Sequence, residues 1–152
     1  MNKNLPLSNI VVLDLTNVLS GPFATQILSD LGAEIIKVEK PNGDDSRKFG
    51  PFIKKRSSYF ISLNRGKKSI ILDFKNEEDK KIFKKLLAIS DVIIDNFKPG
   101  TLEKYGFSSS YLKKNFPSLI QTKISGFGET GPLKENPAYD MIVQAMGGIM
   151  SI

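Results

Sequence analysis

The sequence predicts an α/β fold in which helices cover a parallel β-sheet. Short apolar runs alternate along the chain with longer segments in which apolar residues recur at helical spacing. Stretches rich in Gly, Pro and Asn separate the two kinds of segment, as turns and helix ends require. The chain has 152 residues, of which 40% are hydrophobic, so it can bury the core of one domain. Strands that alternate with helices are typical of right-handed βαβ units.

The predicted strands are short, as expected for strands that are buried on both faces of a parallel sheet. The first, Ile10–Leu15, is almost wholly apolar, and the second, Glu34–Glu39, carries a charged residue at each end. The other predicted strands are Ser69–Leu72, Asp91–Asp95 and Leu119–Ser125.

The first helix is predicted to begin at Ser20-Gly21-Pro22, with Ser20 as its polar cap and Pro22 near the first helical position. Gly32 is expected to end it. The apolar residues of this helix are Phe23, Ala24, Ile27, Leu28 and Leu31, which recur at helical spacing.

A second long helix is predicted to begin after Asn76, which can cap it, and acidic residues follow at its positive end. Its expected buried stripe consists of Ile82, Phe83, Leu86, Leu87 and Ile89, whereas Lys80, Lys81, Lys84 and Lys85 are expected to be solvated. Further helical segments are predicted at Gly100–Tyr105, Ser109–Asn115 and Tyr139–Met150.

The composition restricts the chemistry that this chain can perform. It contains no Cys and no His, which excludes disulfides, thiolate nucleophiles and imidazole bases, and we expect no metal site. The net charge of +6 favours anionic partners, but the basic residues are mostly Lys, unlike those of a dedicated nucleic-acid binder. The sequence has no membrane-spanning apolar run and no signal peptide, so we expect a cytoplasmic protein.

Ligands of parallel α/β sheets bind beyond the carboxyl ends of the strands. This rule indicates the loops Asn17–Pro22, Lys40–Arg47, Asp73–Asn76 and Asn96–Lys104. Their amide, carboxylate, aromatic and ammonium groups suit a nucleotide with phosphates. Each motif taken alone is as well explained by an ordinary turn at the end of a strand.

Two further motifs have competing interpretations. The segment Gly126–Gly131 matches G-x-G-x-x-G, but it follows the fifth predicted strand and Pro132 interrupts any helix, so we interpret it as a Gly-rich loop and not as an NAD site. Tyr139-Asp140 opens the last predicted helix. Asp140 there is either a helix-stabilising carboxylate or one member of a polar pair at a reacting thioester.

Taken together, four stretches resemble the class III CoA-transferases, a family that includes formyl-CoA transferase and α-methylacyl-CoA racemase. The resemblance covers about residues 7–152, in the same order and spacing. The four stretches are VLDLTNVLSGPFATQILSDLGAEIIKVEKPNGDDSR, YFISLNRGKKSIILDFK, DVIIDNFKPGTLEKYGF and SGFGETGPLKENPAYDMIVQAMGGIMS.

The resemblance implies that residues 1–152 form a Rossmann-like, CoA-binding N-terminal domain of a protein that works as an interlocked homodimer. It implies exchange of CoA between an acyl-CoA and a small carboxylic acid through a covalent intermediate on an Asp. That Asp is expected beyond Ile152, so we expect this chain to lack the nucleophile, to be truncated within its apolar last helix, and to be inactive alone.

The resemblance also implies the site residues. Lys40, Lys75, Lys98 and Lys104 would face CoA phosphates, and Tyr139 and Asp140 would support the reaction. The remaining positions implied to contact CoA are Leu19, Ser20, Leu72, Asp73, Phe74, Asn96, Phe97, Pro137 and Ala138.

Two alternatives remain open beside transfer. An acyl-CoA racemase of the same family would need an acid/base pair, and this chain has Tyr139 where that branch carries a His. A CoA- or nucleotide-binding module without catalysis would explain the absence of the nucleophile. A basic nucleic-acid binder would need clustered Arg and aromatic residues, which the sequence lacks.

Overall fold

The computed structural model describes residues 5–152 and has a five-stranded parallel sheet at its centre, as predicted. The strand order is β5-β2-β1-β6-β7, so β1 lies in the middle, between β2 and β6. The chain therefore reverses its direction of winding at β1, which places the ends of β1 and β6 at a switch point. The strands are β1 (Val11–Asp14), β2 (Glu34–Glu39), β5 (Lys68–Ile71), β6 (Val92–Asp95) and β7 (Ile120–Lys123).

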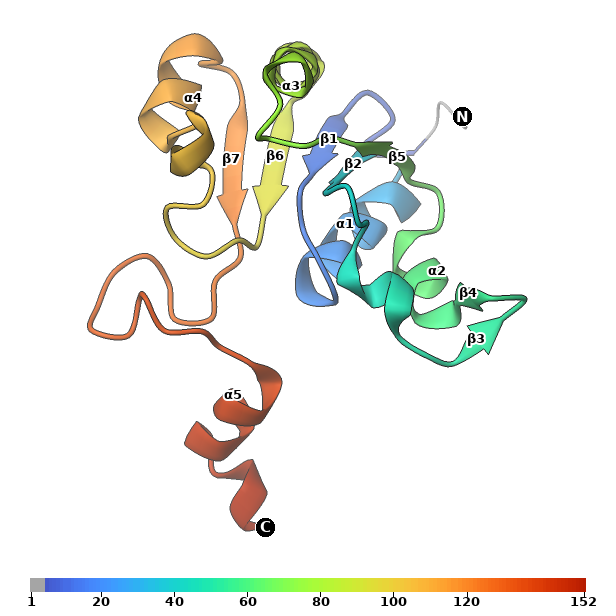
Figure 1. The fold of residues 1–152 in the computed structure, drawn as a ribbon, viewed down its shortest axis with the longest axis vertical. Helices are drawn as coiled ribbons and strands as arrows, with labels where there is room; N and C mark the ends of the chain where they lie inside the picture. Colours follow the sequence, from blue (N-terminus) through green and yellow to red (C-terminus); the bar gives the residue numbers. More distant parts are fainter. Residues whose placement is uncertain (1–4) are drawn as a thin grey trace.

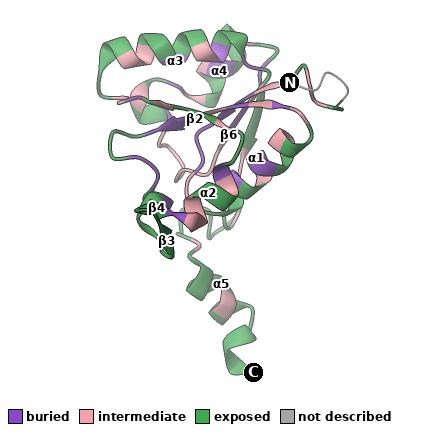
Figure 2. Ribbon diagram, turned by 90° about the vertical axis from the view of Figure 1, so that its right-hand side faces the viewer, coloured by how far each residue is buried: buried purple, intermediate pink, exposed green. Residues whose placement is uncertain are grey.

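Helices cover both faces of the sheet (Figures 1 and 2). The face under α3 and α4 is apolar, and buried Leu13, Leu15 and Phe83 pack there with Phe107. The face under α1 and α2 has a smaller apolar cluster around Val12 and polar side chains beside it. The α-helices are α1 (Ser20–Asp30), α2 (Ser58–Asn64), α3 (Glu77–Ile89), α4 (Ser109–Asn115) and α5 (Asp140–Met146), and the 3-10 helices are η1 (Asp45–Lys48), η2 (Glu103–Tyr105) and η3 (Ile149–Ser151).

The ends of the two long helices follow the local sequence. Gly32, with φ of +103°, follows the last turn of α1, as the sequence predicts. The side chain of Asn76 accepts a hydrogen bond from the Glu78 N–H at 2.9 Å and so caps α3. The prediction for Ser20 is wrong: Leu19 is the capping residue of α1, and its side chain cannot accept a hydrogen bond.

The faces of the helices differ from the pattern in the sequence. The predicted buried stripe of α3 is confirmed at Phe83 and Leu87, but Ile82 and Ile89 are exposed. Helix α1 buries Thr25 and other small or polar residues, packs Leu28 against the cluster around Val12, and leaves other apolar residues outward. The face of α1 that packs on the sheet contacts polar groups there, so the apolar repeat in the sequence does not predict which side of α1 is buried. The outward residues of α1 are Phe23, Ile27 and Leu31.

The sequence does not predict the segment between η1 and β5. It contains a two-stranded hairpin, β3 (Phe52–Ile53) with β4 (Arg56–Ser57), followed by α2. Lys54 and Lys55 form the hairpin turn with φ of +48° and +64°. Strands of two residues are too short to produce a periodic signal.

The C-terminal segment leaves the sheet after β7 and ends in α5, which projects away from the rest of the molecule (Figure 1). The predicted single helix Tyr139–Met150 is interrupted, because α5 ends at Met146 and Gly148 takes φ of +77° before η3. Met141, Met146 and Ile149 are exposed. Among residues 5–152, no helix is long and apolar enough to cross a membrane.

Candidate functional site

The loops at the carboxyl ends of the strands enclose two neighbouring cavities, as the switch-point rule predicts. The first, of about 200 Å³, lies over the ends of β2, β5 and β6. The second, of about 450 Å³, lies between the β6 loop and the segment before α5. Phe97 lines both cavities, so the two lie on either side of one aromatic side chain at this edge of the sheet.

The first cavity has an aromatic and aliphatic wall with charged groups at its rim. Phe74 and Phe97 supply the flat apolar faces, and Lys40 and Asp73 stand among the charged lining residues. A planar ring with a polar edge fits this lining. Its lining residues are Leu15, Asn17, Val38, Glu39, Lys40, Pro41, Leu72, Asp73, Phe74, Phe97, Thr101 and Tyr105.

The second cavity brings distant segments of the chain together. Ser20 from the start of α1 and Asn96 from the β6 loop face the segment Pro137–Tyr139, which precedes α5. Gly126, the first residue of the Gly-rich motif, lies against Ala138 so closely that an added Cβ would stand 1.7 Å from the Ala138 Cβ. The absence of a side chain at Gly126 therefore permits the wall formed by Pro137–Tyr139.

The structure places ten of the thirteen predicted contact residues, and Tyr139, on these two cavities. Lys40, Leu72, Asp73 and Phe74 line the first cavity, Ser20, Asn96, Lys98, Pro137, Ala138 and Tyr139 line the second, and Phe97 lines both.

Four predicted residues lie elsewhere: Leu19, Lys75, Lys104 and Asp140 do not line either cavity. Leu19, Lys75 and Lys104 are exposed. Asp140 begins α5 and accepts a hydrogen bond from Gln144 at 2.6 Å, which agrees with the helix-stabilising interpretation of this carboxylate.

Most of the cationic side chains around the site are exposed ammonium groups. Lys40 Nζ pairs with both carboxylate oxygens of Asp45 at 2.8 and 2.9 Å, so its charge is already partly balanced. Lys98, Lys75 and Lys104 have no ion pair within the 5–152 range. An ammonium group without an ion-pair partner can bind a phosphate group as a point charge.

Asn96 is held by the protein itself, which sequence reasoning missed. Its side-chain oxygen accepts a hydrogen bond from the Asn17 N–H at 2.9 Å, and its side-chain nitrogen donates to the Asn17 carbonyl at 2.9 Å. The Asn96 amide thus joins the loop after β1 to the loop after β6 through a reciprocal pair of hydrogen bonds, like those between adjacent strands. Asn96 is primarily a link between the two loops that form the site.

Glu39 lies at the candidate site and is held by Arg47, a pairing that the sequence analysis did not identify. Glu39 lines the first cavity, and Arg47 binds both of its carboxylate oxygens at 2.6 and 2.7 Å. Burial alone would raise the pKa of Glu39, but hydrogen bonds from Arg47, Ser69 and the Asp44 backbone outweigh it and lower the pKa to about 2. The charges lie eight residues apart, one on a strand and one on a 3-10 helix, so no local pattern links them.

A second acid, Asp95, lies at the end of β6 beneath the loop that carries Asn96 and Phe97. Burial raises the pKa of Asp95, and a hydrogen bond from the Phe97 N–H at 3.0 Å opposes the rise. That hydrogen bond turns the backbone at the strand end and directs Phe97 toward the two cavities.

Curated proteins that resemble this chain are named for the transfer of CoA. The chain is 51% identical to "Acetyl-CoA:oxalate CoA-transferase" of Acetobacter aceti, over 95% of the chain and 38% of that protein. It is 48% identical to "Succinyl-CoA:glutarate CoA-transferase" of Mus musculus, over 97% of the chain and 34% of that protein. The chain thus spans little more than a third of the length of these relatives.

Solved structures share the fold at similar identity. A CAIB/BAIF family protein from Brucella suis superposes with a TM-score of 0.91 and 46% identity, covering 99% of the chain and 41% of that protein. A Mycobacterium tuberculosis protein superposes with a TM-score of 0.87 at 39% identity, covering 95% of the chain and 40% of that protein. The model of one family, CoA-transferase family III, matches residues 7–152. With its site at the carboxyl edge of the sheet and a family match over nearly its whole length, the chain belongs to CoA-transferase family III.

Proposed function

We propose that the complete protein transfers CoA from an acyl-CoA thioester to a free carboxylic acid, and that this chain supplies its CoA-binding, Rossmann-like domain. The observation that carries the proposal is the pair of cavities on either side of Phe97, one with an aromatic wall and the other with a mixed polar and apolar lining. CoA has a matching chemistry, because its planar adenine and its thioester lie at opposite ends of a long flexible molecule.

The adenosine end of CoA is assigned to the first cavity. Leu72, Phe74 and Phe97 would contact the ring, and Asp73 would accept from its exocyclic amine. The phosphates would lie at the rim, where Lys40 lines the first cavity and Lys98 lines the second, and Lys75 and Lys104 would contribute from outside the lining.

The thioester end is assigned to the second cavity, between Ser20 and the segment Pro137–Tyr139. The reaction that we propose there uses the carboxylate of an Asp expected beyond Ile152. That carboxylate attacks the acyl carbonyl and expels the CoA thiolate, which leaves a mixed anhydride. The thiolate then attacks the aspartyl carbonyl, which releases the donor acid as its carboxylate and forms an enzyme-linked CoA thioester. The carboxylate of the acceptor attacks that thioester and expels the CoA thiolate, which leaves a second mixed anhydride. The thiolate then attacks the acceptor's carbonyl carbon, which forms the new acyl-CoA and frees the Asp carboxylate.

Binding of CoA is the first test, because it needs only the residues described here. Isothermal titration of the complete gene product should give tighter binding for CoA than for dephospho-CoA or NADP. We expect a loss of about tenfold without the 3′-phosphate, the size of one charge-assisted contact. Lys40→Ala, at the rim of the first cavity, should reduce this preference, whereas Lys81→Ala, an exposed lysine on α3, should leave it unchanged. Equal affinity for CoA and dephospho-CoA would remove the basis of the proposal.

Transfer itself is tested with the substrate pairs that the relatives' names provide. The complete gene product is incubated with acetyl-CoA and oxalate, or with succinyl-CoA and glutarate, and the new thioester is measured by mass spectrometry. Formation of a new acyl-CoA that requires both substrates supports transfer. Incorporation of deuterium at the α-carbon of a 2-methylacyl-CoA, without transfer, would instead support the racemase. Binding of CoA with neither reaction would support a binding module without catalysis.

We also propose that the complete protein is a homodimer in which α5 and the outward face of α1 are covered. The apolar side chains that α5 exposes, Met141, Met146 and Ile149 among them, support this proposal, because apolar surface of this extent is costly in water. Light scattering after gel filtration should give twice the mass of one chain. A monomer at micromolar concentration would contradict the proposal, and a cytoplasmic location stays a prediction.

A further inference from the structure

The loop between β1 and α1 has a strained backbone. Val18 has φ of +69°, a left-handed conformation that a β-branched side chain rarely adopts. Strain of this kind persists only where the surrounding structure holds it. The loop is part of the candidate site, since Asn17 lines the first cavity and Ser20 lines the second.

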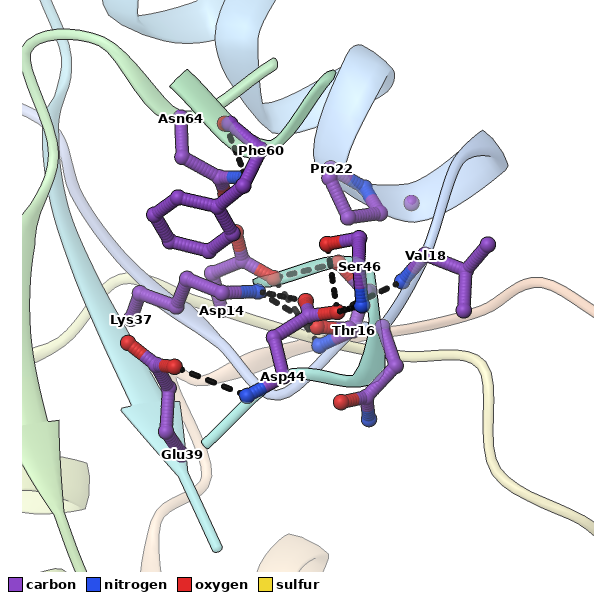
Figure 3. A network of polar contacts seen from close by, with 12 residues as sticks. Asp14, Thr16, Val18, Pro22, Lys37, Glu39, Asp44, Ser46, Phe60 and Asn64 are labelled. Carbon is purple, nitrogen blue, oxygen red and sulfur yellow. Dashed lines mark hydrogen bonds and ion pairs between the residues drawn. The ribbon is translucent and has the colours of Figure 1, made fainter. Parts of the chain in front are cut away.

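A buried carboxylate holds Val18 in this conformation. Asp44 Oδ1 accepts a hydrogen bond from the Val18 N–H at 3.2 Å (Figure 3). Asp44 belongs to the loop after β2, is fully buried and lines neither cavity. Its side chain therefore acts on the site through the backbone of the strained loop, while its backbone N–H donates to Glu39 Oε2 of the first cavity at 2.9 Å.

Asp44 is itself fixed from three directions, so it can act as a rigid support. Ser46 donates to Asp44 Oδ1 from its backbone N–H at 2.9 Å and from its hydroxyl at 2.7 Å. Lys37 Nζ lies 2.9 Å from Asp44 Oδ2, and both side chains are almost completely buried. Lys37 also donates to the Thr16 carbonyl at 2.7 Å, so the pair binds the loop at two points, as Figure 3 shows.

The opposite side of the loop is held by Asn96, through its two hydrogen bonds with the Asn17 backbone. Asp44 and Asn96 therefore hold the loop from β2 and from β6. The loop leads directly into α1, whose first residue, Ser20, faces the second cavity. A change of the backbone at Val18 would move Ser20 relative to the wall formed by Pro137–Tyr139.

We propose that Asp44, fixed by Lys37, is a positioning residue that keeps Val18 in its left-handed conformation and so places Ser20 for the thioester end of an acyl-CoA. The assignment of the thioester to this cavity rests on the proposed function, whereas the holding of Val18 by Asp44 does not. The buried pair thus has two roles. The Lys37 and Asp44 charges stabilise each other, and the hydrogen bond from the Val18 N–H to Asp44 shapes the site.

The decisive experiment combines loss of the support with relief of the strain. In the complete gene product, Asp44→Ala is made together with Lys37→Met, because removal of one partner alone would leave a buried unpaired charge. We expect kcat for transfer between acetyl-CoA and oxalate, or succinyl-CoA and glutarate, to fall about tenfold or more, and KM for the acyl-CoA to change by less than about threefold. Adding Val18→Gly should restore kcat to within about threefold, because glycine adopts positive φ without strain.

The control is the second buried lysine. Lys67→Met removes the cation of an equally buried pair that does not contact Val18, so adding Val18→Gly should not recover any fall in kcat that Lys67→Met causes. Failure of Val18→Gly to rescue the Lys37→Met/Asp44→Ala variant, or equal rescue of Lys67→Met, would assign the pair to general packing and overturn the proposal.

A measurement without any ligand separates this inference from the proposed function. Hydrogen exchange of the Val18 amide, followed by NMR on ¹⁵N-labelled protein, should be slow in the wild type and at least about tenfold faster in the Lys37→Met/Asp44→Ala variant. If the wild type neither binds CoA nor transfers it, the proposed function fails and the exchange rates still decide whether Asp44 holds Val18. An unchanged exchange rate would overturn the inference even if CoA transfer is confirmed.

Discussion

The two faces of the central sheet are built from opposite chemistry. Under α3 and α4, the side chains of Leu13, Leu15 and Phe83 form an apolar core with aromatic contacts, such as Phe74 against Phe83 at 4.8 Å between ring centroids. Under α1 and α2, the same strands turn Asp14 and Lys37 into the interior. Adjacent residues of a strand point to opposite faces, so one strand contributes to both environments.

The apolar face mainly stabilises the fold, whereas the polar face fixes the positions of the loops at the site. Apolar contacts are non-directional and tolerate small shifts, so the α3 side stabilises the fold without fixing the loops of the site. Charged hydrogen bonds are directional, and those on the α1 side end on loop atoms such as the Val18 N–H and the Thr16 carbonyl. The polar face therefore determines where the loops at the carboxyl ends of the strands lie.

The largest expected effect is on the apolar face. Phe83→Ala leaves a cavity among aromatic neighbours, and we expect a loss of ~3–5 kcal/mol in the free energy of unfolding, measured by urea denaturation. Phe83 lines neither cavity but packs against Phe74 of the first cavity, so the affinity for CoA of the molecules that remain folded should fall by less than the stability does. A specific loss of CoA affinity at unchanged stability would contradict the division between the two faces.

Breaking a buried pair on the polar face should cost somewhat less. Lys67 Nζ donates to Asp14, to Thr25 and to the Pro22 carbonyl, and burial lowers its pKa against the opposing effect of Asp14. Lys67→Met leaves the Asp14 carboxylate buried without its cation, so we expect ~3 kcal/mol of destabilisation. An effect below ~1 kcal/mol in urea denaturation would show that the Asp14 carboxylate finds water or other donors.

Acid should weaken the polar face first, through Glu39. Its folded-state pKa of about 2 lies below the ordinary glutamate value of 4.5, so its contribution is fully present above about pH 5 and is lost as the pH falls toward 2. This difference in pKa corresponds to at most ~3.4 kcal/mol, which solvent screening of the Arg47 pair reduces to roughly 2–3 kcal/mol. Glu39→Gln should flatten the dependence of the urea midpoint on pH in this window, whereas Glu78→Gln on the exposed side of α3 should not. An equally steep dependence in the Glu39 variant would assign the acid sensitivity to other groups.

The smallest effect is expected at the surface of α3. Lys81 pairs with Glu78 at 2.7 Å, with both side chains exposed, so Lys81→Ala should change stability by less than ~0.5 kcal/mol. This variant calibrates the comparison, because it removes a charge pair of similar length without removing a buried one. A change above ~1 kcal/mol would mean that distance and not burial governs the ion pairs of this protein.

Much of the fold and of the site follows from local sequence. The apolar runs locate all five strands of the sheet, and Asn76 and Gly32 locate helix ends, because these signals depend on neighbouring residues. The loops Lys40–Arg47 and Asn96–Lys104 were located because parallel strands place their carboxyl ends at one edge. The resemblance then indicated which residues of those loops to expect at a ligand, and Phe97 lies at the junction of both cavities.

The sequence by itself determined the succession of strands and helices along the chain and the edge of the sheet at which a ligand can bind. Only the tertiary structure decided how the buried charges pair, since Lys37 with Asp44 and Lys67 with Asp14 join residues on different elements. It also decided that α1 turns several of its apolar residues outward. The physical reason is that strands, helices and turns depend on neighbouring residues in the sequence. The partner of a buried charge, in contrast, depends on which elements the fold brings together.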